Sequence, residues 1–153
     1  MKSLKALQED PVLLVVAGGM LLVFATVTVG LVWMLRYEGG PEQAAVHDRV
    51  KAFVRALEGR DVNAAWENMA PEYRSASSRQ RLAQQIGAEP HLARMTGAEM
   101  GQYQRSRGTA RVSGIILSET GEIAATVHLT REGGRWGIVQ VELAGRPALE
   151  FGN

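Results

Sequence analysis

The sequence predicts an α+β protein with one N-terminal transmembrane helix, followed by a small domain of about three helices packed on a four-stranded antiparallel sheet. Three observations lead to this prediction. An uncharged apolar stretch of 25 residues lies near the N-terminus. Apolar residues then recur at helical spacing, and from about residue 99 onward they alternate with polar ones. Helices followed by a run of strands are typical of α+β domains.

The apolar stretch, Pro11–Leu35, is long enough to span a bilayer. As a helix it would measure about 37 Å, against roughly 30 Å for the hydrocarbon core. Trp33 and Tyr37 fit an interfacial aromatic belt, and the stretch is too long for the apolar part of a cleaved signal peptide. Both lysines of residues 1–10 precede it, which predicts a cytosolic tail. We therefore expect a single-pass bacterial membrane protein whose domain lies on the extracytoplasmic (periplasmic) side of the inner membrane.

A short linker, residues 36–41, connects this segment to a domain expected over residues 42–144. The first helix is predicted from Glu42 to Leu57, because apolar residues recur there every three or four positions. Gly59 is expected to end it.

Two shorter helices are expected next. Asp61 is placed to cap the first of them, and Ser77 with Gln80 has the spacing of a capping box for the second, which runs to about Ile86. The segment from residue 87 to residue 97 is expected to be irregular.

The remainder of the domain predicts strands joined by short, glycine-containing hairpins. In the third strand, apolar and polar residues alternate, so that one face should be buried and the other polar. The tail, residues 145–153, is expected to be flexible. The four strands are expected at about Glu99–Gln104, Thr109–Ser118, Glu122–Thr130 and Arg135–Leu143.

Composition excludes several classes of function. The chain has no cysteine, so disulfides, thiolate zinc sites, iron–sulfur clusters and a cysteine nucleophile are excluded. Its 17 basic and 16 acidic residues nearly balance. Because such a chain has no bulk positive field, we expect no nucleic-acid partner.

No motif for catalysis, a cofactor or a metal stands out. The three histidines, His47, His91 and His128, are expected on a helix, in a loop and on a strand, without metal-ligand spacing. Asp61 could act as a base in a pocket, but helix capping is the preferred interpretation of its position. We predict no catalytic residue, no cofactor and no metal site. Four aromatic residues remain as candidates to line a pocket, with core packing as their default role: Trp66, Tyr73, Tyr103 and Trp136.

The segments 57–66 and 69–74, with the strand ending Gly134-Arg135-Trp136-Gly137-Ile138, resemble the nuclear-transport-factor-2-like (cystatin-like α+β) superfamily. Its bacterial, membrane-anchored members of unknown function are the nearest resemblance, which covers about residues 43–143. The stretch around Trp136 also resembles the cytochrome oxidase assembly factor family. The resemblance implies a cone-shaped domain and carries over no functional residue, because such folds host many functions.

Together these observations predict a membrane-anchored, non-enzymatic accessory or binding domain at the cell envelope. Its expected partners are the lipid bilayer and either a membrane-complex protein or a small apolar ligand, with a homodimer through the sheet as a further expectation. Two alternatives stay open: an assembly factor for a respiratory cytochrome oxidase complex, and an isomerase- or cyclase-like enzyme. The enzyme would need an ionisable group, Asp61 or His128, pointing into the pocket.

Overall fold

The computed structural model describes residues 40–150. The predicted cytosolic tail, membrane segment and most of the linker lie outside the described residues. Within residues 40–150, no helix combines the length and the apolar character that a membrane span requires.

The described chain is α+β, with five helices followed by five strands. The helices are more numerous than the three expected from the sequence. Their bounds are α3 Pro41–Glu58, α4 Val62–Asn68, α5 Pro71–Ala76, α6 Arg79–Ala88 and α7 Pro90–Ala93.

The long first helix agrees with its prediction to within one residue at each end. Its buried residues include Val46, Val50, Phe53 and Leu57, which recur at spacings of three and four and form one apolar stripe. After Gly59, Asp61 caps α4 by accepting a hydrogen bond from the backbone N–H of Ala64 at 3.0 Å.

Three local predictions for the helices need correction. Ser78, not Ser77, caps α6, because its Oγ accepts a hydrogen bond from the N–H of Arg81 at 3.1 Å. A proline can occupy the first turn of a helix without losing a hydrogen bond. Pro71 and Pro90 do so: Pro71 begins α5, a helix that was not expected, and Pro90 begins α7 within the segment that was expected to be irregular.

The five strands form one antiparallel sheet in the order β1-β2-β3-β4-β5. The fifth strand lies in the segment that was expected to be a flexible tail. It forms because Gly145, at φ +76°, turns the chain back, and because Leu149 is fully buried. The bounds are β1 Met95–Ser106, β2 Thr109–Ser118, β3 Gly121–Glu132, β4 Arg135–Leu143 and β5 Arg146–Leu149.

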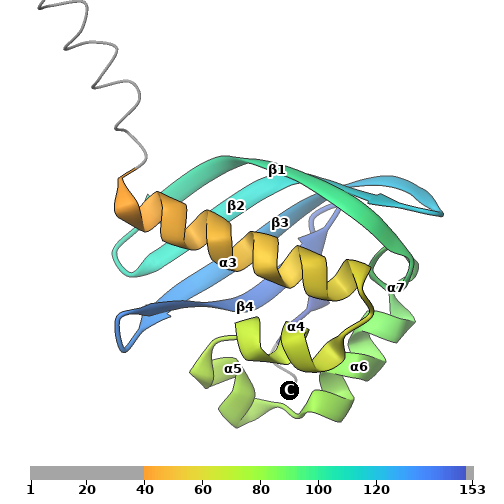
Figure 1. The fold of residues 1–153 in the computed structure, drawn as a ribbon, viewed down its shortest axis with the longest axis horizontal. Helices are drawn as coiled ribbons and strands as arrows, with labels where there is room; N and C mark the ends of the chain where they lie inside the picture. The colour runs from red at the N-terminus through yellow and green to blue at the C-terminus, as the bar shows by residue number, and fades with distance from the viewer. Residues whose placement is uncertain (1–39, 151–153) are drawn as a thin grey trace, which may run out of the picture. The chain divides into compact units, whose positions relative to one another are not determined.

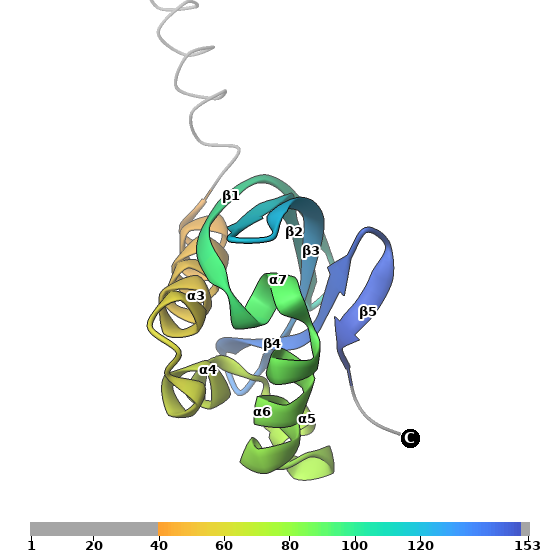
Figure 2. The ribbon, with the colours of Figure 1, turned by 90° about the vertical axis from the view of Figure 1, so that its right-hand side faces the viewer.

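The helices pack on one face of this sheet. Figure 1 shows α3 lying across the strands, and Figure 2 shows β5 on the side of the sheet away from α3. The buried residues of β2, β3 and β4 alternate with more exposed ones and join the stripe of α3 in a single core. The other face of the sheet therefore carries the remaining side chains of these strands.

Two glycines allow close approach of the backbone. At Gly137 in β4, a Cβ atom would lie 2.4 Å from the Cα of Ala70, the residue that precedes α5. The N–H of Ala70 also donates to the carbonyl oxygen of Ile138 at 2.8 Å. At Gly114 in β2, a Cβ would lie 2.0 Å from the carbonyl oxygen of Glu99, where β1 bends at a bulge.

Candidate functional site

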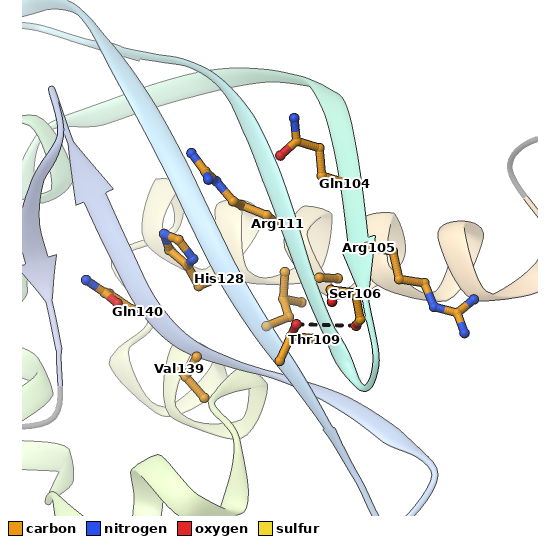
Figure 3. Close-up of a pocket in the computed structure, with 10 residues that line it drawn as sticks. Gln104, Arg105, Ser106, Thr109, Arg111, His128, Val139 and Gln140 are labelled. Carbon is orange, nitrogen blue, oxygen red and sulfur yellow. Dashed lines mark hydrogen bonds between the residues drawn. The ribbon is translucent and has the colours of Figure 1, made fainter.

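The sheet face that faces away from α3 carries a row of polar side chains. Gln104 of β1 pairs with Arg111 of β2, which pairs with His128 of β3, which pairs with Gln140 of β4. Directly paired residues of an antiparallel sheet point to the same face, so the four side chains stand side by side. Figure 3 shows them on one side of the strands. We call this surface, with the residues described next, the open face.

A second row runs beside the first, two residues further along each strand. Ser113 and Thr126 are paired, and their hydroxyl oxygens lie 3.1 Å apart. Glu142 of β4 receives a hydrogen bond from Nε2 of Gln140 at 3.3 Å. Nε2 of His128 lies 3.1 Å from the same Oε1 atom, close enough for an ion pair but poorly aligned for a hydrogen bond. Glu142 thus joins the two rows.

A groove of about 480 Å³ lies along the first row, between the ends of β1 and β2 and the middle of β4. A bulge in β4, opposite the step from His128 to Leu129, places the extra residue Val139 beside Gln140 at this groove. The groove is open to solvent, and Figure 3 shows the residues that line it. Its lining combines amide, guanidinium and imidazole groups with an apolar margin.

Arg111 is an exposed cation of the open face, and it takes part in none of the ion pairs found among residues 40–150. His128 and Glu142, in contrast, are about three-quarters covered. A guanidinium group offers a planar fork of donors that suits a carboxylate, so this position can bind an acidic group of a partner.

An exposed apolar side chain adds to this surface. Ile115 follows Ser113 by two residues and is paired with Ala124, which places it on the open face. It is 39% exposed, and it is the only large hydrophobic residue of the described chain that is so exposed. The open face therefore presents a polar groove with an apolar contact beside it, a combination found in protein interfaces.

The four aromatic candidates lie in the hydrophobic core or pack against it. Trp66, Tyr73 and Trp136 are buried, and the rings of Trp66 and Tyr73 meet edge-on with centroids 6.1 Å apart. Tyr103 is partly buried in β1, with its ring centroid 6.0 Å from that of His47. None of the four lines the groove or either of the two smaller hollows described below. Their roles are those of core residues.

The ionisable groups that the enzyme alternative requires do not point into the core. Asp61 is exposed and caps α4, and His128 lies on the open face beside Glu142. His91 lies 3.1 Å from Glu89, and His47 lies on α3 near Gln43. Among residues 40–150, no three potential ligands gather in a way that could hold a metal ion.

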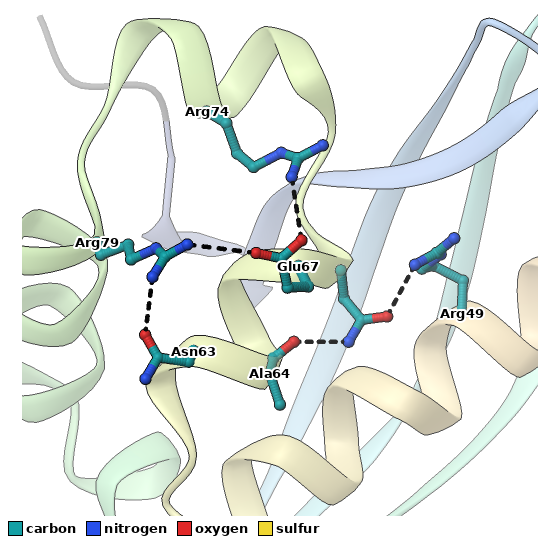
Figure 4. A network of polar contacts seen from close by, with 7 residues as sticks. Arg49, Asn63, Ala64, Glu67, Arg74 and Arg79 are labelled. Atoms are coloured by element: carbon teal, nitrogen blue, oxygen red, sulfur yellow. Dashed lines mark hydrogen bonds and ion pairs between the residues drawn. The ribbon is translucent and has the colours of Figure 1, made fainter.

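A polar network on the other side of the molecule serves the fold. Glu67 of α4 pairs with Arg74 of α5 at 3.3 Å and with Arg79 of α6 at 3.4 Å (Figure 4). Beside it, the buried Asn68 accepts from Arg49 at 3.1 Å and donates to the carbonyl oxygen of Ala64 at 2.8 Å. These bonds link four helices, and they give both the oxygen and the nitrogen of the Asn68 side-chain amide a partner.

Two smaller hollows lie among the helices. One of about 200 Å³ lies between α3 and β1, and includes His47, Lys51 and Glu58. The other, of about 180 Å³, lies between the end of α3 and helices α6 and α7, and includes Asp61 and Leu92. Both are smaller than the roughly 300 Å³ at which ligand pockets usually begin. The groove of the open face is therefore the stronger candidate site.

The pH dependence of stability provides a test of the environment of Tyr73 in this core. Its side chain is fully buried, and its hydroxyl donates to Oε1 of Gln85 at 2.8 Å. Burial raises the pKa of Tyr73, against smaller lowering effects of a hydrogen bond with Ser77 and the charge of Arg81. The folded state therefore holds the phenolic proton more tightly than the unfolded state, whose pKa is about 10. This contribution to stability is complete below pH 10 and is lost as the pH rises towards the folded pKa.

We expect Tyr73→Phe to lower the free energy of unfolding by about 1 kcal/mol at neutral pH, because the bond to Gln85 is lost. The difference from wild type should shrink above pH 10, since phenylalanine has no proton to lose. Urea unfolding of both proteins between pH 7 and pH 11 measures this difference. A difference that stays constant over that range would contradict the raised pKa.

Comparison with known proteins gives no assignment for this site. No protein-family model and no curated protein sequence matches the chain.

The sequence contained one signal for the open face. The alternation of the third strand placed His128 on a polar face, where it was interpreted as an ordinary exposed residue. Gln104, Gln140 and Glu142 carry no such signal, because only the register of the strands brings them together with His128. Register depends on turns and bulges and cannot be read from one strand alone.

Proposed function

We propose that this chain is a membrane-anchored, non-enzymatic accessory domain of the cell envelope that binds a protein partner on the open face of its sheet. The observation that carries the proposal is the row of Gln104, Arg111, His128 and Gln140, in register across four strands on the face away from α3. The anchor is the apolar stretch predicted at residues 11–35.

The partner that suits this surface is a protein segment with an acidic group. Arg111 supplies an exposed guanidinium without a carboxylate partner among residues 40–150. The two amides can each donate and accept, so they can bind a peptide backbone in either direction. Ile115 supplies apolar contact area next to the polar rows. A small apolar ligand is less well suited to a groove lined mainly by polar groups.

The superfamily resemblance supports a binding role without choosing the partner. The order of helices and then an antiparallel sheet is compatible with a nuclear-transport-factor-2-like domain. Such folds are used for protein contacts as well as for chemistry, so the support for a binding role comes from the residues of the open face.

The absence of cysteine allows a clean test, because a single introduced cysteine is the only thiol to label. Gln104→Cys places a photoactivatable crosslinker on the open face, and Ala52→Cys places it on the exposed side of α3. Both proteins would be expressed in full length and irradiated in membranes. We expect the Gln104→Cys protein to capture a specific partner at least severalfold more efficiently. Equal capture from both positions would contradict the proposal.

A further inference from the structure

One end of the sheet carries a cluster of arginines, which we call the basic end: Arg105, Arg107, Arg131 and Arg135. They lie in and beside the β1–β2 and β3–β4 hairpins. Figure 1 shows both hairpins at the same end of the domain as the start of α3. The N–H of Arg131 donates to the carbonyl oxygen of Gly108 at 2.8 Å, so the two hairpins are joined.

The basic end lies beside the start of α3, the first helix of the domain. Glu42, in the first turn of α3, forms ion pairs with both Arg105 and Arg131. Arg107 and Arg135 are exposed and take part in none of the ion pairs found among residues 40–150. Each of the two therefore has its full charge available for an external anion.

The β2–β3 hairpin, at the opposite end of the sheet, carries Glu119 and Glu122, and both are exposed. β3 has twelve residues and spans roughly 37 Å between the two ends. The domain thus presents a positive end beside the start of α3 and an acidic hairpin far from it.

The chain length places the basic end near the bilayer. Six residue-to-residue steps lead from the end of the predicted membrane segment, Leu35, to the start of α3 at Pro41. Even when fully extended, they span at most about 21 Å. Glu42, at the start of α3, forms ion pairs with an arginine beside each hairpin. The arginines of the basic end therefore lie close to the end of this short linker.

We propose that the basic end binds the anionic headgroups of the bilayer in which the chain is anchored. This inference rests on the membrane anchor in the proposed function. Arginines close to an anionic membrane each strengthen attraction to it, by roughly fivefold in an equilibrium constant. The open face is a different surface from the basic end, so a membrane contact at the basic end leaves it accessible to a neighbouring membrane protein.

The test uses the full-length chain in nanodiscs, either of phosphatidylcholine alone or of phosphatidylcholine mixed with phosphatidylglycerol. A single cysteine at the basic end, Glu132→Cys, or at the acidic hairpin, Glu119→Cys, carries a dye whose emission reports a nonpolar environment. These are matched changes at opposite ends of β3. We expect a blue shift for the Glu132→Cys label only, larger with phosphatidylglycerol and weakened by salt.

Substitution then tests the arginines themselves. Arg107→Gln with Arg135→Gln should lower the ratio of docked to undocked domain roughly 25-fold in anionic nanodiscs, as two contributions of about fivefold multiply. The control, Arg60→Gln with Arg146→Gln, removes two exposed arginines at the other end of the domain and should leave the emission unchanged. An identical response of both double variants would overturn the proposal.

A second readout separates this inference from its premise. Extraction of native membranes with alkaline carbonate should leave the full-length chain in the membrane fraction. If the chain is extracted, the anchor and this inference both fail. If the chain stays in the membrane but the emission of the Glu132→Cys label is the same with and without phosphatidylglycerol, the proposed headgroup contact alone is wrong.

Discussion

Gly137→Ala should destabilise the domain by about 3–4 kcal/mol, because the added methyl group overlaps buried backbone. The new Cβ would lie 2.4 Å from the Cα and 2.8 Å from the N of Ala70, and neither is the end of a flexible side chain. Ala70 is fully buried and bonded to Ile138, so relief of the clash requires loss of that hydrogen bond. β4 and the start of α5 must then separate.

Thermal unfolding of the full-length protein in detergent, followed by tryptophan fluorescence, measures this effect. For a domain of this size, we expect the midpoint to fall by roughly 10–20 °C. Gly101→Ala is the matched control, because Gly101 in β1 has no heavy atom within 4 Å of the new Cβ and no positive φ. The control should stay within about 1 kcal/mol of wild type. Equal midpoints for Gly137→Ala and wild type would show that β4 does not approach Ala70 so closely.

The helical half of the domain could be predicted where its pattern was periodic. The stripe of α3 and the cap at Asp61 follow from residue spacing and from the chemistry of an oxygen near free N–H groups. The helices that were missed, α5 and α7, have six and four residues. Such lengths are too short for a period to appear, and their stability comes from packing.

The sheet was predictable in its hairpins but not in its irregularities. Glycines at the turns indicated β2, β3 and β4, and the structure confirms these three strands to within about two residues of the predicted bounds. The bulges in β1 and β4 and the fifth strand depend on contacts between distant residues, such as the burial of Leu149. The open face depends on these features, which is why Gln104, Gln140 and Glu142 cannot be assigned to it from the sequence.

Arg111→Glu should strongly weaken partner binding with little effect on folding. The side chain is exposed, and such changes usually alter stability by no more than about 0.5 kcal/mol. At an interface, the change removes a charge-assisted hydrogen bond and opposes an acidic group with a like charge. Such losses cost about 2–4 kcal/mol, which lowers affinity by roughly 30-fold or more.

Lys51→Glu is the matched control for this charge reversal. Lys51 is an exposed residue of α3, in the layer that covers the other face of the sheet. The net charge of the two variants is therefore the same, and only the place of the change differs. Binding should be retained in the control, and both variants should unfold at the temperature of wild type.

The most direct measurement is a pull-down of the full-length protein from crosslinked, solubilised membranes, with wild type, Arg111→Glu and Lys51→Glu in parallel. The account predicts a reproducible membrane-protein partner with wild type and Lys51→Glu, and at least a tenfold loss of that partner with Arg111→Glu. Recovery of the same partner in equal amounts with all three proteins would contradict the assignment of binding to the open face.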